Sequence, residues 1–149
     1  MEKERKNPNL VNTFSIVGFD PNTGELGVAV ASKFLGVGSI VPWARAGAGA
    51  VATQSWANKD YGQKGLELLE KGMTPDAVLS ELTKDDEGLQ LRQVGMVSAK
   101  GESVTFTGED CYEWAGGIAG ANFACRVIFL LTKQLYKKWL MCSSPSRER

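Results

Sequence analysis

Two short segments near the N-terminus most constrain what this chain can fold into, because together they predict a strand, a tight turn and a second strand. Thr13–Phe19 and Glu25–Ser32 are rich in apolar residues, and the Pro, Asn and Gly of Asp20–Gly24 are typical of turns. Alternate residues of a strand point to opposite faces. One face of the second strand carries only small residues, namely Gly27, Ala29 and Ala31. The sequence therefore predicts a hairpin whose small-residue face is closely approached by another element or by a substrate.

The remaining patterns predict an α+β fold. Further strands are expected at Val37–Val41, in the C-terminal part of Trp43–Gln54, at Gln93–Ser98 and at Ser103–Thr107. Helices are expected at Tyr61–Lys71, and from Pro75, with Thr74 as N-cap, up to the acidic run Asp85–Gly88. Two groups of mainly antiparallel strands separated by a pair of helices are typical of the α+β class.

Length and composition indicate one ordinary globular domain. The chain has 149 residues, of which 43% are hydrophobic and 23% are charged. The charged N-terminus lacks the apolar segment of a signal peptide, and the longest apolar run, Val127–Leu131, is too short to cross a bilayer. Three cysteines without metal-ligand spacing fit reduced thiols. We therefore expect a cytoplasmic protein with no membrane span and no bound metal.

The two parts of the chain differ in charge. Residues 1–125 carry 11 Lys and Arg against 16 Asp and Glu, whereas residues 126–149 carry 6 Lys and Arg and a single acid, Glu148. An acidic body argues against nucleic-acid binding, which needs clustered Lys and Arg. We divide the chain into a polar leader (residues 1–12), a domain (residues 13–125) and a basic, atypical tail (residues 126–149).

Three interpretations of the tail are open. It forms an amphipathic helix that meets a membrane or a partner, or a C-terminal helix packed on the sheet. Alternatively it is a frameshifted end, because one restored nucleotide could turn codons for Arg126–Leu130 into codons for Gln-Gly-Asn-Ile-Leu. Sequencing the DNA around Cys125 tests this hypothesis, since codons incompatible with the slip exclude it.

The chain contains no histidine. Its absence excludes Ser-His-Asp and Cys-His catalysis, and it removes the commonest metal ligand and the usual proton shuttle near neutral pH. Any hydrolytic reaction must therefore use another base, and nothing in the sequence calls for a cofactor.

Several long motifs lie between residues 13 and 125. They are Thr13-Phe-Ser-Ile-Val, Asp20-Pro-Asn-Thr-Gly-Glu-Leu-Gly-Val-Ala-Val-Ala-Ser-Lys33, Val41-Pro-Trp-Ala-Arg-Ala-Gly-Ala-Gly-Ala-Val-Ala-Thr-Gln54 and Cys111-Tyr-Glu-Trp-Ala-Gly116. They resemble the N-terminal-nucleophile (Ntn) hydrolase-like family known as domain of unknown function 1028. The resemblance implies a four-layer αββα sandwich of mainly antiparallel sheets. That sandwich would be incomplete at its C-terminus, because the family pattern breaks after Cys125.

The resemblance also implies a nucleophile, Thr13, that begins the first strand. An Ntn hydrolase uses the α-amino group of its first residue as the base, and such a group has a pKa near about 7.7–8.0. Here twelve residues precede Thr13, so the nitrogen becomes an amine only if the chain is cut between Asn12 and Thr13. Otherwise Thr13 is a plain β-branched strand residue.

Other polar residues are candidates for supporting roles. Lys33 could depress the pKa of a nearby hydroxyl or amine, and Arg45 could hold an oxyanion or a substrate carboxylate. Ser15 is a secondary nucleophile candidate. The candidates for substrate binding are Ser32, Gln54, Trp56 and Asn58. Each of these residues could instead serve only in packing, capping or surface ion pairs.

Three functional hypotheses follow. The chain is an Ntn-type hydrolase of an amide bond in a small molecule or peptide, or it is a noncatalytic binding or assembly module with an Ntn-like fold. In either case we expect a homo-oligomer. In the third, a frameshifted tail leaves a defective fragment whose unpaired sheet edges favour association.

Overall fold

The computed structural model describes residues 12–112 and 114–128. The predicted leader, except Asn12, and the tail beyond Ile128 lie outside the described residues. The strands are β1 (Thr13–Phe19), β2 (Leu26–Ser32), β3 (Pro42–Arg45), β4 (Gly49–Ser55), β5 (Arg92–Ser98), β6 (Ser103–Thr107), β7 (Gly116–Gly120) and β8 (Phe123–Ile128). The helices are α1 (Lys59–Glu70) and α2 (Pro75–Thr83), with short 3₁₀ turns at Val37–Ser39 and Leu89–Leu91.

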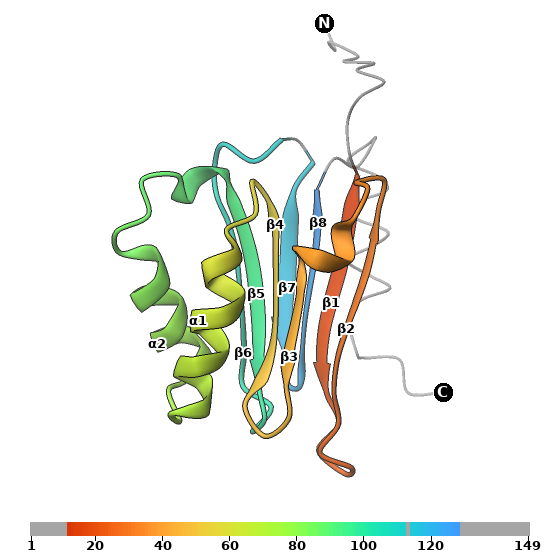
Figure 1. Cartoon of the computed structure of the whole chain (residues 1–149), viewed down its shortest axis with the longest axis vertical. Helices are drawn as coiled ribbons and strands as arrows, with labels where there is room; N and C mark the ends of the chain where they lie inside the picture. The colour runs from red at the N-terminus through yellow and green to blue at the C-terminus, as the bar shows by residue number, and fades with distance from the viewer. Residues whose placement is uncertain (1–11, 113, 129–149) are drawn as a thin grey trace, which may run out of the picture.

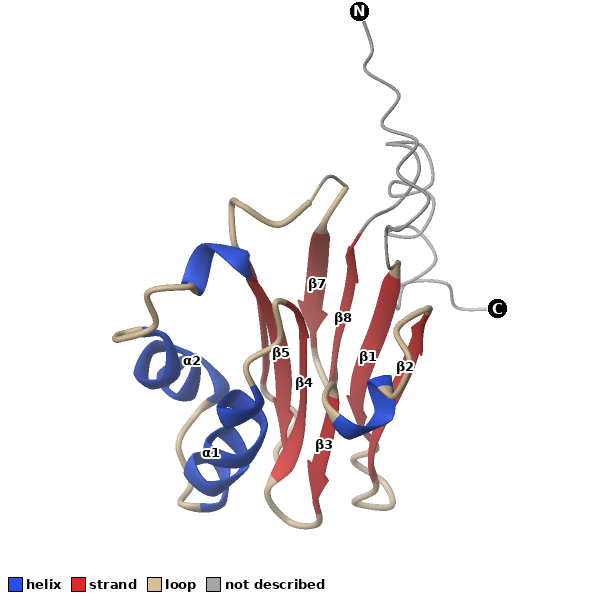
Figure 2. Cartoon of the chain, turned by 45° about the horizontal axis from the view of Figure 1, so that its top comes forward, coloured by secondary structure: helices blue, strands red, loops and turns tan. Residues whose placement is uncertain are grey.

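The strands form two four-stranded antiparallel sheets that stack on each other (Figure 1). Sheet A has the order β2-β1-β8-β7 and sheet B the order β3-β4-β5-β6. Helices α1 and α2 lie over the face of sheet B that points away from sheet A (Figure 2). The α+β class predicted from the sequence is therefore confirmed, with two sheets and two helices in the described part of the chain.

The predicted N-terminal hairpin is also confirmed. β1 pairs with β2 from Thr13 opposite Ser32 to Phe19 opposite Leu26. On its other side β1 pairs with β8, where Thr13 lies opposite Ile128. β1 is therefore an interior strand of sheet A, and its odd-numbered side chains from Thr13 to Phe19 face sheet B, whereas Phe14 and Ile16 face outward.

Apolar side chains fill both interfaces of sheet B. Between sheet B and the helices lies a cluster of Val51, Tyr61, Leu66, Leu69, Val78, Val94 and Met96. Between the two sheets lies a second cluster of Val17, Val41, Ala50, Ala52, Val97 and Ala124. Every residue of β4 except Ser55 is buried because β4 has a covered face on each side.

The strand predicted at Val37–Val41 is wrong. The chain forms a 3₁₀ turn at Val37–Ser39, and the next strand begins only at Pro42. Gly36 adopts a left-handed backbone with φ 77°, and the Ser39 hydroxyl donates a hydrogen bond of 2.8 Å to the Gly36 carbonyl. These local bonds close the turn and stop the segment from extending.

Other boundaries differ by a few residues. α1 begins at Lys59, two residues earlier than predicted, because Asn58 is its N-cap, and α2 ends at Thr83, before the acidic run. Strands β7 and β8 extend the predicted order, and β8 continues without interruption from Phe123 across the predicted domain boundary to Ile128. The frameshift hypothesis stays a prediction. No helix within the described ranges is long and apolar enough to cross a membrane.

Candidate functional site

A cluster of polar side chains lies between the two sheets near the end of β1 that carries Thr13. The cluster comprises Thr13, Ser15, Ser32, Gln54, Gln93 and Arg126, and we call it the interlayer polar cluster. β1, β2 and β8 supply it from sheet A, and β4 and β5 supply it from sheet B. The rest of the interface between the two sheets is filled by the apolar cluster described above. Polar contacts thus lie at one end of the strands and apolar contacts lie further along them.

Thr13 stands at the edge of this cluster. Its side chain is 5% exposed, and its hydroxyl lies 2.9 Å from the hydroxyl of Ser32, directly across the hairpin. The Ser32 hydroxyl also accepts a hydrogen bond of 3.0 Å from the backbone N–H of Phe34. Thr13 and Ser32, predicted as nucleophile and substrate-binding residue, are thus brought together. In the intact chain the Thr13 nitrogen belongs to a peptide bond with Asn12.

Two buried glutamines link the sheets. The Ser15 hydroxyl donates to the side-chain carbonyl of Gln54, whose amide donates to the side-chain carbonyl of Gln93 at 2.6 Å. The Gln93 amide donates to the Thr107 hydroxyl at 2.8 Å and to the Gly116 carbonyl at 3.1 Å. Gln54 and Gln93 are almost fully buried and have partners at both ends of their amides. The predicted substrate-binding residue Gln54 therefore lies inside this network.

Arg126 is the unusual member, because its side chain is fully buried and no carboxylate among the described residues forms an ion pair with it. Its Nε and Nη2 donate to the Ser15 hydroxyl at 3.2 and 3.1 Å, and its Nη1 has no hydrogen-bond partner. Removal from water lowers the pKa of the guanidinium to about 10. Gly95 makes room for this side chain, since a Cβ on Gly95 would lie 1.4 Å from Nη1. The guanidinium therefore fits sterically but carries an uncompensated charge.

Ser15 has the right neighbours for a polarised hydroxyl but lacks a base. It accepts from a guanidinium and donates to an amide carbonyl, which is too weak a base to remove its proton. Ser15 is therefore better suited to holding Arg126 than to acting as a nucleophile.

The two predicted cations lie in different places. Lys33 is exposed and directly follows β2, one residue from Ser32 and close to the Thr13 end. Arg45 ends β3 at the opposite end of the sandwich, where it forms a 2.7 Å ion pair with Glu70. The strand register therefore does not bring Arg45 and Thr13 together, and the oxyanion role of Arg45 stays a prediction.

The structure also shows the contacts of Asn58 and Trp56, the two remaining residues predicted to bind substrate. The Asn58 side chain accepts a hydrogen bond of 3.0 Å from the backbone of Asp60 and caps α1. The Trp56 side chain is 59% exposed, and its carbonyl accepts a hydrogen bond from Arg92. Arg92 in turn pairs with Asp86, which also accepts from the Tyr61 hydroxyl. Capping accounts for Asn58, whereas the Trp56 side chain remains open to solvent.

Sequence reasoning missed Gln93 and Arg126 as members of the cluster. Gln93 lies in β5 and Arg126 in β8, two strands in which every residue except the first is buried and most of the buried residues are apolar. A long polar side chain flanked by apolar strand residues could have indicated membership of a buried polar cluster, because a buried polar group needs a hydrogen-bond partner. Arg126 was instead counted with the basic tail. In the described ranges no group of three or more His, Cys, Asp or Glu side chains could hold a metal ion.

Comparisons with known proteins point to one family. The model of the family of unknown function DUF1028 matches residues 13–141. The chain is similar to the crystal structure of protein SPO2555 from Silicibacter pomeroyi, which carries the same family model, with 27% sequence identity and a TM-score of 0.80. The alignment covers 90% of this chain but 61% of SPO2555, so this chain spans less than two thirds of that protein's length. No curated protein matches the chain.

Proposed function

This chain belongs to the DUF1028 family of unknown function, and we propose that it is an Ntn-type hydrolase of an amide bond with Thr13 as its nucleophile. The same proposal assigns it to the four-layer αββα sandwiches of that class. Two stacked antiparallel sheets with helices over sheet B support this assignment. Fold alone does not establish activity, so the proposal depends on the surroundings of Thr13.

One observation carries the proposal. Thr13 is at once the first residue of the family match and the first residue of β1, and its hydroxyl faces the interlayer polar cluster 2.9 Å from Ser32. A threonine in this position needs only a free α-amino group to have a base on its own Cα. The chain has no histidine to serve as the base, and an α-amino group would supply one at this position.

The reaction requires cleavage between Asn12 and Thr13. Once free, the Thr13 amine takes the proton of its own hydroxyl, whose oxygen attacks the substrate carbonyl carbon. The amine then gives this proton to the leaving nitrogen, and water hydrolyses the resulting ester with the same amine as base. Ser32 can hold the Thr13 hydroxyl, and Lys33 can stabilise negative charge at this end of the sheet.

Exposed apolar side chains near Thr13 fit a substrate with an apolar group. Phe34 and Leu35 follow β2, and Trp56 follows β4, with exposed fractions of 49%, 94% and 59%. β2 ends opposite Thr13, and β4 ends beside the Ser15–Gln54 hydrogen bond. We therefore propose a small-molecule or peptide amide as the substrate, with no nucleic acid, membrane or cofactor involved.

A chain that begins at Thr13 directly after the initiator Met tests this proposal. Intact-mass spectrometry should show Thr13 as the first residue, and the protein should release the amine from members of a panel of aminoacyl and peptidyl anilides. Thr13→Ser should retain activity, and Thr13→Ala should lose it while keeping the same circular dichroism spectrum. Equal activity of Thr13→Ala, or activity in a chain that retains residues 1–12, would overturn the proposal.

The same apolar side chains also favour the second candidate, a binding or assembly module. In the intact chain Thr13 is 5% exposed and its hydroxyl is already paired, whereas Leu35 and Trp56 are open to solvent. This function predicts concentration-dependent homo-oligomers in light scattering that Leu35→Asp weakens and Thr13→Ala leaves unchanged.

A further inference from the structure

Strand β2 forms one edge of sheet A. It pairs with β1 from Leu26 to Ser32, and within the described residues no strand pairs with its other flank. Figures 1 and 2 both show β2 at the border of the described part of the molecule. Every residue of β2 is at least partly exposed, whereas the interior strand β1 contains buried residues. β2 therefore presents a free row of backbone N–H and C=O groups.

The three other edge strands of the described sheets are shorter than β2. β3 has four residues and begins at Pro42, which has no backbone N–H, and β6 and β7 have five residues each. β2 has seven residues, and it contains no proline and no charged side chain. Short edge strands, prolines and charges are the usual features that prevent one sheet from pairing with another. β2 has none of these features, which indicates an edge that pairs with another strand.

The hydrogen bonds of the hairpin identify the groups of β2 that point outward. The backbone N–H of Asp20 donates to the carbonyl of Glu25 at 2.9 Å. Glu25 and every second residue after it therefore turn their backbone groups toward β1, and the residues between them turn theirs to the free edge. The residues with outward groups are Leu26, Val28, Val30 and Ser32.

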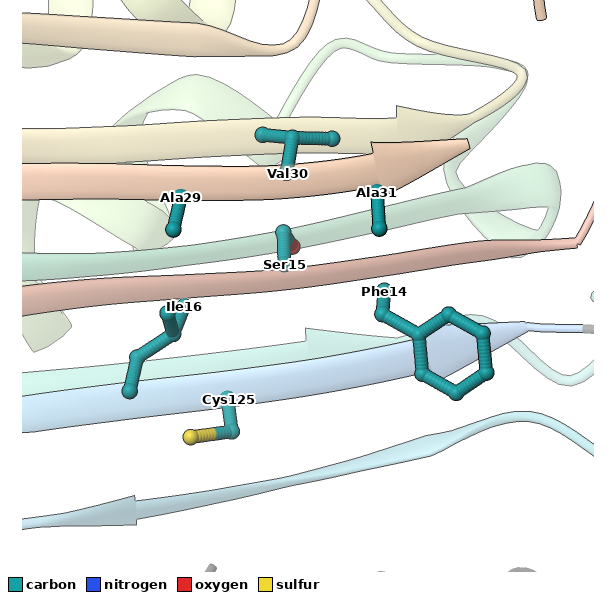
Figure 3. A pocket seen from close by; sticks show the side chains of 7 residues that line it. All are labelled: Phe14, Ser15, Ile16, Ala29, Val30, Ala31 and Cys125. Atoms are coloured by element: carbon teal, nitrogen blue, oxygen red, sulfur yellow. The ribbon is translucent and has the colours of Figure 1, made fainter. Parts of the chain in front are cut away.

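The space beside this edge is open. Gly27, Ala29 and Ala31 are exposed, and a Cβ on Gly27 would meet no atom of the described residues within 4 Å beyond its chain neighbours. Figure 3 shows Ala29 and Ala31 on one side of β2 and Val30 on the other, beside a hollow of about 340 Å³. Leu35, which follows the strand, is 94% exposed. No bulky side chain on the outer face of β2 therefore keeps a second strand away, and an apolar side chain lies just beyond its end.

We propose that two copies of this chain join edge to edge through β2, with the two strands antiparallel about a two-fold axis at Ala29. Val28 of each copy then lies opposite Val30 of the second copy, and Leu26 lies opposite Ser32 of the second copy. These are the residues whose backbone groups are free, so each such pair exchanges two bonds, and the edge gains about eight backbone hydrogen bonds. The two A sheets become one continuous sheet with a self-complementary interface.

Charge complementarity selects a second copy as the partner and fixes the register. Glu25 directly precedes β2, Lys33 directly follows it, and both are exposed. Ala29 lies midway between them, so the axis places Glu25 of each copy opposite Lys33 of the other. Opposite charges that face each other across two strands attract. A register shifted by two residues would keep the backbone bonds in phase but would lose both charge pairs.

The inference does not rest on the proposed hydrolase activity, because it uses only the free edge of sheet A. It assigns a defined interface to the homo-oligomer that the sequence leads us to expect. Its test measures association and geometry, so its failure would leave the catalytic proposal untouched.

Exchange of the two charges in the full chain tests the register. Sedimentation velocity should show that the natural chain dimerises as its concentration rises. Glu25→Lys alone and Lys33→Glu alone should each raise the dissociation constant of the dimer about tenfold, because like charges then face each other twice. The double variant should return the constant to within about threefold of the natural value. Glu25 and Lys33 of one copy lie at opposite ends of β2, so this recovery reports contact between copies.

Single cysteines on β2 give a second readout. Cys111, Cys125 and Cys142 are first replaced by Ser, Ala and Ser. Ala29→Cys then places two thiols opposite each other at the axis, in a pair whose Cα atoms lie about 4.5 Å apart, which suits a disulfide. Ala31→Cys is the matched control, because its two copies would lie at least about 13 Å apart. Mild oxidation should link Ala29→Cys into covalent dimers much faster than Ala31→Cys.

Each other outcome overturns the proposal. A monomer at every concentration, or a dimer that the single charge changes leave intact, would exclude this pairing. A double variant that dimerises no more tightly than the single variants would exclude contact between Glu25 and Lys33. Equal or absent linking of the two cysteine variants, or faster linking through Ala31→Cys, would exclude an axis at Ala29. The charge variants keep the natural cysteines, so their result does not depend on the folding of the cysteine-free chain.

Discussion

Replacing Arg126 with Gln should stabilise the protein. The Arg126 side chain is fully buried, and within the described part of the chain it has no acidic partner and its Nη1 makes no hydrogen bond. A glutamine at this position loses the charge but can still bond to the Ser15 hydroxyl. The gain should be the same at every pH from about 4 to 9, because Arg126 is protonated in both the folded and unfolded states over that range.

The magnitude follows from the burial of the guanidinium. Burial lowers its pKa to about 10, roughly two units below that of an exposed guanidinium, and one pKa unit corresponds to about 1.4 kcal/mol. The charged form is therefore destabilised by about 3 kcal/mol. The shorter side chain leaves a void, and a void of about 30 Å³, the volume of one water, costs about 0.7 kcal/mol at 24 cal/mol per Å³. We expect a net gain of about 2 kcal/mol in the free energy of unfolding.

Urea unfolding followed by tryptophan fluorescence measures this gain. With a slope of about 2 kcal/mol per M, the midpoint of Arg126→Gln should rise by about 1 M at unchanged slope. Arg92→Gln is the matched control, and it should lower the midpoint because Arg92 is paired with Asp86. An unchanged or lower midpoint for Arg126→Gln would refute the reasoning that the buried charge is uncompensated.

Three other changes have defined outcomes. Asp86 has a lowered pKa, so its stabilising contribution is complete above about pH 4 and is lost as the pH falls; Asp86→Asn should cost about 2 kcal/mol at pH 7 and flatten the acid side of a stability–pH curve. Gly95→Ala should destabilise by about 1–3 kcal/mol, and a double-mutant cycle with Arg126→Gln should recover at least about 0.5 kcal/mol. Asn58→Ala should lower the thermal midpoint through about 1 kcal/mol of lost capping, whereas Asn58→Asp should not.

The sequence predicted those elements whose signals are local. The β1–β2 hairpin has a turn of Pro, Asn and Gly, and α2 has Thr74 and Pro75 at its start, so both were placed within one residue of their observed N-terminal limits. The strand predicted at Val37–Val41 failed because two glycines and Ser39 close a turn there. Val41 is nevertheless buried, because it packs between the two sheets.

The interlayer polar cluster was less accessible to prediction. Thr13 and Ser32 come together through the register of a single hairpin, which the sequence predicted. Gln54, Gln93 and Arg126 meet only because the two sheets stack, and nothing local fixes that contact. The ion pair of Arg45 was also not predictable from local sequence, because its partner Glu70 lies 25 residues away on α1.

The position of β1 inside sheet A affects what a cut before Thr13 would do to the structure. β1 is paired on both flanks from its first residue, with Ser32 on one side and Ile128 on the other. Scission at that bond breaks no rung of either ladder, so the new terminus would stay anchored at a fixed point instead of fraying.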